Sequence, residues 1–418
     1  MTRFRVRSSG PLEGTVHISG ATKNSGLKQM AAALLVSGVT TLRNMPTVRD
    51  LDVMVDLLRA AGATVDLPEP GVVRIDTGGD LTPVAPYELV TRMRASFNVL
   101  GPLLARCGEA RIALPGGDNI GSRKVDMHLR GLEAMGAEVE VEHGYVVARA
   151  ELLHGARVVL EFPSVGATEN LLCTAVLAKG TTVIENAARE PEVADLAAFL
   201  DRMGAHVLGA GTSTIEVQGV EELHAAESAI MGDRVEAGTL LMACGLLGGE
   251  IELVGIQPVH VEMVVMKLAE MGMRVSPTSD GLWARGPKRL RAVDVATLPY
   301  PGFATDFMPL AVAMMTKADG TAIVTENVYD SRFQFVDELA RMGADVRTEG
   351  RHAIVRGVER LTGAPVQASD VRAGAALVLA GLAAEGETVV HEGEHVERGY
   401  ADLAGQLRNL GADVEKLD

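Results

Sequence analysis

The sequence predicts an α/β protein of two domains, each built from three copies of one repeated unit. Its 418 residues suffice for two or three domains. One four-residue motif, a glycine followed by a small or apolar residue, a polar residue and a valine, occurs six times within similar helix and strand patterns. The motifs begin 68 to 74 residues apart, at Gly62, Gly136, Gly204, Gly272, Gly343 and Gly411. Such regular spacing is typical of internal repeats.

Each repeat is expected to contain two kinds of helix separated by strands. The glycine of the motif ends a helical pattern, as after Phe335–Met342, and the valine starts a strand. Upstream lies a helix that is apolar all round and should therefore be buried on every side. Such stretches are Leu27–Val36, Ala95–Ala105, Ala167–Ala178 and Ala373–Ala384. Because an alternating strand such as Thr181–Asn186 follows the buried helix, each unit should run strand, buried helix, strand, exposed helix, strand.

The composition predicts a soluble globular protein. A net charge of −16 disfavours binding to nucleic acid or to an anionic membrane, and 3% aromatic residues disfavour a base-stacking surface. The longest apolar stretches, such as Ala375–Ala384, are far shorter than the roughly 20 residues that span a bilayer. Cys107, Cys173 and Cys244 lie in apolar helical patterns without metal-ligand spacing. We therefore expect a cytoplasmic monomer without a disulfide, a metal or another cofactor.

Charged and polar residues gather where the buried helices should begin. The N-terminus of a helix offers free backbone N–H groups and a partial positive charge. Lys23, Arg94 and Arg372 add cations there, although a cation opposes the helix dipole. If these helix ends line a cleft between the two domains, the cleft should bind anions. For four further residues, helix capping alone remains an alternative: Ser164, Asp233, Thr305 and Asp370.

A second candidate feature is the segment Leu114–Arg123, which contains three glycines and a proline. This composition favours a mobile loop that could act as a lid, and an ordinary surface turn is the alternative. The loop holds one possible acid, Asp118, and one phosphate-binding cation, Arg123. Arg332 and Arg398 are further candidate anion ligands, unless they belong to solvated charged faces.

From Pro11 to Asp413 the sequence resembles the enolpyruvyl transferase family. The most specific stretches are ISGATKNSGLKQMAAALL, RASFNVLGP, LPGGDNIGSRKVDMH, FPSVGATEN, ENAAREPEV, PGFATD, ENVYDSRF, SDVRAGAALVLAGL and HVERGY. The resemblance implies a two-domain inside-out α/β barrel of six βαβαβ-type units with the active site in the interdomain cleft. It also implies that residues 1–22 join 233–418 in the first domain. Residues 23–232 would form the second domain and carry the lid loop 115–123.

The implied reaction transfers the enolpyruvyl group of phosphoenolpyruvate to the 3-hydroxyl of UDP-N-acetylglucosamine and releases phosphate, a step of peptidoglycan synthesis. A related enzyme acting on another uridine nucleotide such as UMP is the alternative. The extra residue Thr22 beside Lys23, and Lys124 after the loop arginine, favour that alternative. A nucleic-acid end-processing protein is disfavoured by the net charge, and a non-catalytic homologue is disfavoured by the presence of the expected site residues.

The resemblance also implies a role for individual residues. Phosphoenolpyruvate would bind Lys23, Arg123 and Arg398, with Arg94, Arg332 and Arg372 nearby. The sugar would contact Asn24 and Asp306, and Asp306 would accept the proton of the hydroxyl, although it too could be only a helix cap. The uridine diphosphate part would lie on Val125, Asp126, Met127, Ser164, Val165, Gly166 and Val328. Asp118 would donate a proton from the position where the family usually has a cysteine; the catalytic set is thus Lys23, Asp118 and Asp306.

Overall fold

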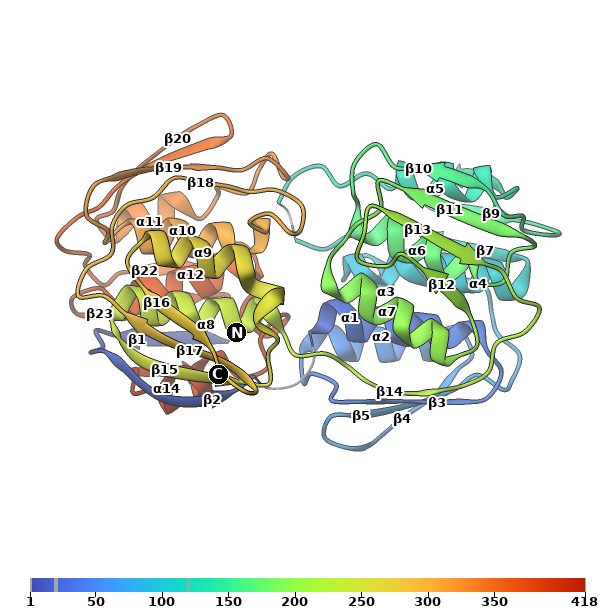
Figure 1. Ribbon diagram of the computed structural model, residues 1–418, viewed down its shortest axis with the longest axis horizontal. Helices are drawn as coiled ribbons and strands as arrows, with labels where there is room; N and C mark the ends of the chain where they lie inside the picture. The colour runs from blue at the N-terminus through green and yellow to red at the C-terminus, as the bar shows by residue number, and fades with distance from the viewer. Residues whose placement is uncertain (1, 19–21, 119, 418) are drawn as a thin grey trace. The chain divides into compact units, whose positions relative to one another are not determined.

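A computed structural model describes residues 2–18, 22–118 and 120–417. The chain groups into two compact units (Figure 1). Unit 1 comprises Met1–Ser19, Asp118–Ser122 and Gly232–Asp418, and unit 2 comprises Gly20–Gly117 and Arg123–Met231. The sequence-based boundaries put the whole loop 115–123 in the second domain, whereas the structure groups its middle part with unit 1.

Each unit contains three four-stranded sheets with the same topology. The sheets of unit 2 are β14-β3-β5-β4 (Glu227–Ala229, Val39–Arg43, Val72–Asp76, Thr64–Glu69), β6-β7-β9-β8 (Val84–Ala85, Glu109–Ala113, Tyr145–Arg149, Glu138–Glu142) and β10-β11-β13-β12 (Arg157–Val159, Thr181–Glu185, Thr214–Gln218, His206–Leu208). Those of unit 1 are β16-β17-β15-β2 (Arg274–Pro277, Gly281–Gly286, Gly249–Val254, Leu12–His17), β18-β19-β21-β20 (Val295–Ala296, Thr321–Thr325, His352–Arg356, Asp345–Glu349) and β22-β23-β1-β24 (Pro365–Gln367, Glu387–His391, Arg3–Arg7, Val414–Leu417). Every sheet has one parallel pairing, and its other pairings are antiparallel.

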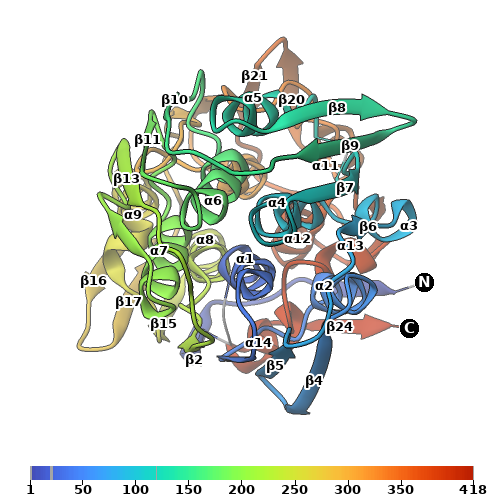
Figure 2. The same cartoon turned by 90° about the vertical axis from the view of Figure 1, so that its right-hand side faces the viewer.

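The helices predicted to be buried form the centre of each unit. They are α1 (Lys23–Ala32), α4 (Leu100–Cys107) and α6 (Val165–Ala175) in unit 2, and α8 (Arg234–Leu247), α10 (Met308–Met315) and α12 (Val371–Leu382) in unit 1. Every residue of α10 and α12 is buried. Figure 2 shows α1, α4 and α6 gathered together and seen nearly end-on, with strands around them.

The second helix of each repeat is amphipathic, and these helices cover the sheets. They are α2 (Arg49–Ala60), α5 (Asp126–Ala134), α7 (Pro191–Arg202), α9 (Glu262–Glu270), α11 (Val336–Arg341) and α14 (Leu403–Asn409). Short helical segments complete the described chain: α3 (Tyr87–Val90), α13 (Glu394–Glu397), η1 (Ala33–Leu35), η2 (Arg94–Val99), η3 (Pro258–Val261) and η4 (Thr305–Phe307). Among the helices of the described ranges, none is both long and apolar enough to cross a membrane.

The six motif glycines end the amphipathic helices with a left-handed backbone. Their φ angles lie between +87° and +105°, a region that side chains with a Cβ rarely adopt. The next strand begins two residues later, except in the last repeat, where β24 begins at Val414, three residues after Gly411. The expected role of the motif as helix stop and strand start is confirmed.

The repeat has one strand more than the sequence predicts, because a hairpin follows the amphipathic helix in five of the six repeats of the described chain. In the second repeat of unit 2, β8 and β9 are joined by two residues, His143 and Gly144, which both have positive φ angles of 50° and 82°. That turn folds a continuous run of strand-forming residues back on itself. In the last sheet the fourth strand is the N-terminal β1, which pairs with β23 and β24.

Candidate active site

Three of the four polar residues at helix starts cap their helices. The side chain of Ser164 accepts a hydrogen bond from the N–H of Ala167, and Asp233 and Asp370 each accept two from the first turns of α8 and α12. Capping alone therefore explains their position. Thr305 behaves differently, because its hydroxyl donates to Glu326 Oε2 at 2.7 Å and no side chain caps η4.

In unit 1, Asp306 joins two of the predicted anion ligands. Its Oδ1 lies 2.9 Å from Arg332 Nη2, and its Oδ2 lies 3.1 Å from Arg372 Nη2. Both arginine residues are only 4% exposed. Burial alone would raise the pKa of Asp306, but the charges of Arg372 and Arg332 outweigh it and lower the pKa below the ordinary range. Asp306 is therefore an ion-pair partner, and the alternative that it is a helix cap is wrong.

The two arginines retain donors that the described part of the protein does not use. Arg332 Nη1 donates to Thr305 Oγ1 at 2.7 Å. However, Arg332 Nε and Arg372 Nη1 are buried and have no hydrogen-bond partner among the described residues. Because buried N–H donors are nearly always satisfied, these two atoms are candidate donors to a ligand anion or a water.

The loop acid is also paired with a predicted anion ligand. Asp118 Oδ1 accepts a hydrogen bond from Arg398 Nη1, and His395 Nδ1 lies 4.0 Å from the same oxygen. The Asp118 and Arg398 side chains are 17% and 19% exposed. Within unit 1 the loop is further held at Ser122, whose N–H donates to Asp330 Oδ1 at 3.2 Å. Asn119, in the middle of the loop, lies outside the described residues.

Gly121 is required where the loop approaches Asp330. Its φ of +122° is unfavourable for any residue with a Cβ, and a Cβ placed there would lie 2.0 Å from Asp330 Oδ1. A larger residue would therefore displace the loop from this anchor.

In unit 2, Lys23 begins α1 and pairs with a residue that the sequence analysis did not single out. Its Nζ lies 2.8 Å from Asp50 Oδ2, and the two side chains are 13% and 4% exposed. Asp50 stands in the first turn of α2, two residues before the exposed Asp52. Sequence alone offers no signal that separates these two acids. Asn24 follows Lys23, and its backbone N–H donates to Thr22 Oγ1.

Arg94 and Arg123 flank the first part of the loop. Arg94 begins η2, and its Nη2 donates to the carbonyl of Lys124 at 3.2 Å. A Cβ placed on Gly117 would lie 3.1 Å from Arg123 Nη2 and 3.2 Å from the backbone N of Arg94. The guanidinium of Arg123 and the backbone of Arg94 thus lie beside the same loop glycine of unit 2.

The two segments expected to hold the uridine diphosphate part begin neighbouring helices. Val125 precedes the first turn of α5, and Ser164 caps α6. His128 of α5 connects them, since its Nδ1 lies 3.0 Å from Asn170 Nδ2 and a Cβ on Gly166 would lie 3.4 Å from its Cε1. The sequence analysis missed His128, because a single histidine in a helix carries no sign of burial.

A buried ion pair joins α1 to α6. Lys28 Nζ lies 2.7 Å from Glu169 Oε2, and the two side chains are 10% and 0% exposed. Burial raises the pKa of Glu169 to about 7, although Lys28 lowers it. This pair fixes the helix that begins with Lys23 against the helix capped by Ser164.

His128 should make the protein less stable at low pH. Burial, helped by the charges of Arg94 and Lys28, lowers its pKa to about 3 from the ordinary 6.5. The neutral form is therefore favoured in the folded state, so its contribution is complete above pH 6.5 and is lost as the pH falls towards 3. The loss should approach about 1.4 kcal/mol per pH unit.

Urea unfolding between pH 4 and 8 measures this contribution. In His128→Gln the slope due to this residue should vanish, whatever the absolute stability of the variant. A variant with the same pH slope as the wild type would show that His128 is not responsible.

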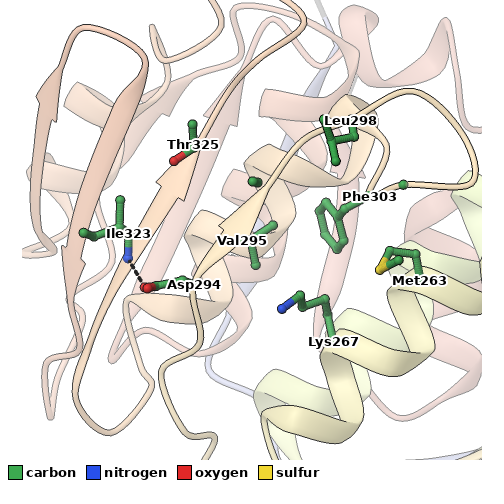
Figure 3. A pocket seen from close by; sticks show the side chains of 10 residues that line it. Met263, Lys267, Asp294, Val295, Leu298, Phe303, Ile323 and Thr325 are labelled. Atoms are coloured by element: carbon green, nitrogen blue, oxygen red, sulfur yellow. Dashed lines mark hydrogen bonds between the residues drawn. The ribbon is translucent and has the colours of Figure 1, made fainter.

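One pocket of unit 1 has a volume of about 380 Å³ (Figure 3). It is lined by α9, β18, β19 and the segment between β18 and β19. Met263, Val295, Leu298 and Phe303 give it a largely apolar wall. None of the predicted site residues lines it. Across the described ranges, no three His, Cys, Asp or Glu side chains gather as they would around a metal ion.

Comparison with known proteins agrees with this arrangement. The sequence model of EPSP synthase (3-phosphoshikimate 1-carboxyvinyltransferase) matches residues 6–407. The chain belongs to this enolpyruvyl transferase family. The family membership accounts for the two units of three repeats, since solved members have the same fold.

Relatives within the family are similar over nearly their whole length. A UDP-N-acetylglucosamine 1-carboxyvinyltransferase of Nocardia farcinica is 51% identical, with 99% of this chain and 98% of that protein covered. Proteins of the same name from Caldanaerobacter subterraneus and Mycobacterium tuberculosis are 50% identical, with 99% of each chain covered.

Two solved structures show how widely the fold is shared. The enolpyruvyl transferase NikO from Streptomyces tendae superposes with a TM-score of 0.86 at 25% identity, over 99% of this chain and 98% of that chain. An EPSP synthase from Acinetobacter baumannii superposes with a TM-score of 0.76 at 18% identity over 100% of both chains, a likeness of fold alone.

Proposed function

We propose that this protein transfers the enolpyruvyl group of phosphoenolpyruvate to the 3-hydroxyl of UDP-N-acetylglucosamine and releases phosphate. The observation that carries the proposal is the 50–51% identity, over nearly the full length, with relatives named for this reaction. The reaction is the first committed step of peptidoglycan synthesis, and we place it in the cytoplasm. It is a transferase reaction between two small anionic molecules.

The cations of both units would hold phosphoenolpyruvate. We assign Lys23 and Arg123 of unit 2 and Arg398 of unit 1 to its phosphate and carboxylate. Arg94, Arg332 and Arg372 would add charge nearby. The planar fork of a guanidinium suits both anionic groups, and the unused buried donors of Arg332 and Arg372 support a ligand there.

Asp118 would donate the proton to the methylene carbon of phosphoenolpyruvate. A carboxylate that is paired with Arg398 has no proton to give. When the substrate binds Arg398, it takes over this ion pair and brings negative charge to Asp118, which favours the protonated form. Substrate binding would therefore load the acid for the reaction. The neighbouring carbon then becomes positively charged and is attacked by the hydroxyl of the sugar.

Asp306 would accept the hydroxyl proton. Its present pairing with Arg332 and Arg372 makes it a weak base. Substrate anions that engage these arginines would restore its basicity, so that the base becomes competent only with ligands bound. The tetrahedral intermediate then loses phosphate, whose charge the same cations stabilise, and a proton leaves the methyl group to restore the double bond.

A uridine nucleotide such as UMP remains the second candidate acceptor. The two unusual residues Thr22 and Lys124 favour it. The structure gives Thr22 a separate explanation, because its buried side chain caps α1. Thr22 therefore does not require a different acceptor.

Phosphate release from phosphoenolpyruvate tests the proposal, with UDP-N-acetylglucosamine and UMP as parallel acceptors. We expect release that depends on UDP-N-acetylglucosamine and a carboxyvinyl product of matching mass. Release with UMP alone would replace the proposed acceptor.

Arg123→Ala should weaken phosphoenolpyruvate binding and turnover together. The loss of a charge-assisted contact corresponds to about 1.5–3 kcal/mol, or roughly a tenfold to hundredfold effect. Arg157→Ala is the matched control, since Arg157 is 71% exposed and pairs only with Glu185 among the described contacts. Steady-state kinetics of both variants decide the point; equal kinetics would remove Arg123 from the site.

A further inference from the structure

Glu326 is a fully buried carboxylate at the end of β19 that accepts four hydrogen bonds. Its Oε1 accepts from Thr297 Oγ1 at 2.9 Å, from the N–H of Val328 at 2.7 Å and from the N–H of Tyr329 at 3.0 Å. Its Oε2 accepts from Thr305 Oγ1 at 2.7 Å. The residue is 0% exposed. One side chain thus connects three separate segments of unit 1.

Two of these segments carry residues assigned to the UDP-sugar. Thr305 directly precedes Asp306, and its hydroxyl oxygen also accepts the hydrogen bond of Arg332 Nη1. On the opposite side, Val328 itself donates to Glu326. The distance between the sugar-binding Asp306 and the uridine-binding Val328 is therefore set through one carboxylate.

The third segment makes the arrangement rigid. Thr297 donates its hydroxyl proton to Glu326 and accepts the N–H of Asn327 at 2.8 Å with the same oxygen. The side chain of Asn327 donates back to the carbonyl of Thr297 at 3.1 Å. Glu326 and its neighbour in the chain are thus bound to the same residue, which leaves the carboxylate one orientation.

The site favours an acid over an amide. All four partners of Glu326 donate to it, and its carboxyl group offers acceptors on both oxygens. A glutamine would turn its NH2 group towards one set of donors and weaken those hydrogen bonds. The four hydrogen bonds offset the cost of burying the polar side chain.

We propose that Glu326 is a positioning residue for the UDP-sugar, which holds Asp306 at a fixed spacing from Val328. The inference rests on the proposed function. Glu326 touches none of the reacting groups and acts through Thr305 and Val328.

Glu326→Gln tests the proposal, with Asp294→Asn as the matched control. Asp294 supports the other end of the same strand, because its Oδ1 accepts the N–H of Ile323 at 2.7 Å (Figure 3). It adjoins no residue assigned to a substrate. Both variants remove one carboxylate charge that accepts a backbone N–H near β19.

We expect Glu326→Gln to raise the KM for UDP-N-acetylglucosamine about tenfold to a hundredfold, and the KM for phosphoenolpyruvate far less. Asp294→Asn should leave both constants close to the wild-type values. Thr305→Val removes one of the four bonds to Glu326, together with the acceptor of Arg332 Nη1, and should raise the same KM. Equal changes in both KM values, or none, in Glu326→Gln and Thr305→Val would overturn the proposal.

Hydrogen exchange without ligand separates this inference from the proposed function. The amides of Val328 and Tyr329 should exchange faster in Glu326→Gln than in the wild type or in Asp294→Asn. If Glu326→Gln does not fold, the same amides in Thr305→Val provide the measurement. Unchanged exchange in the variant would contradict the positioning role. If exchange is faster in the variant but the wild-type protein is inactive with UDP-N-acetylglucosamine, only the proposed acceptor is contradicted.

Discussion

Fosfomycin should leave the wild-type protein active, and Asp118→Cys should make it sensitive. In family members with a loop cysteine this epoxide alkylates the thiolate. A carboxylate is a far weaker nucleophile, and Asp118 is paired with Arg398. The cysteine variant should keep activity, because a thiol can also donate a proton, and should lose it with time when fosfomycin is added.

The three native cysteines offer no alternative target. Burial raises the pKa of Cys107 and of Cys173, and raises that of Cys244 to about 11. Cys107 is half-buried and the other two are buried. At neutral pH all three are thiols rather than thiolates. Alkylation of any of them with loss of wild-type activity, seen by mass spectrometry, would contradict the assignment.

Asp118→Asn is the control for the cysteine variant. It keeps the size of the side chain but cannot donate a proton as an acid, so its turnover should fall about 10²–10⁴-fold. Activity of Asp118→Cys should decline at alkaline pH as the thiol ionises, near pH 8.5 for a free cysteine. An asparagine variant as active as the wild type would show that the proton comes from another group.

The fold could be predicted from the sequence because it is encoded locally and six times over. A glycine such as Gly343 ends a helix through its own φ angle, and the burial of α12 follows from a helix without a polar face. The second strand of each hairpin escaped prediction, since turns as short as His143–Gly144 interrupt the alternation hardly at all.

The site was accessible to sequence analysis only through its motifs. The resemblance supplied residues such as Arg332, but not the partners that decide their state. Asp50 beside Lys23, and Glu326 beside Thr305, lie 27 and 21 residues away in the chain. Sequence periodicity does not link such positions, because their contacts arise when separate segments of one unit pack together. Ion pairs that change the basicity of a carboxylate therefore require coordinates.

Asp306→Asn should slow the chemical step and also destabilise the protein without ligand. An amide cannot accept the hydroxyl proton, so turnover should fall about 10²–10⁴-fold. It also leaves the buried Arg332 and Arg372 with less compensation. Breaking a fully buried pair costs about 3–5 kcal/mol. We expect a smaller loss here, because the Asp306 side chain is 31% exposed.

Inorganic phosphate should distinguish the two roles of Asp306. If the two arginines form an anion site that Asp306 occupies in the free protein, phosphate should raise the Tm of Asp306→Asn more than that of the wild type, since it replaces the missing charge. Asp337→Asn is the control, because Asp337 is an exposed acid in the first turn of α11. Its stability should stay within about 0.5 kcal/mol of the wild type. Equal stabilisation of all three proteins by phosphate would show that substrate anions do not compete with Asp306 for Arg332 and Arg372.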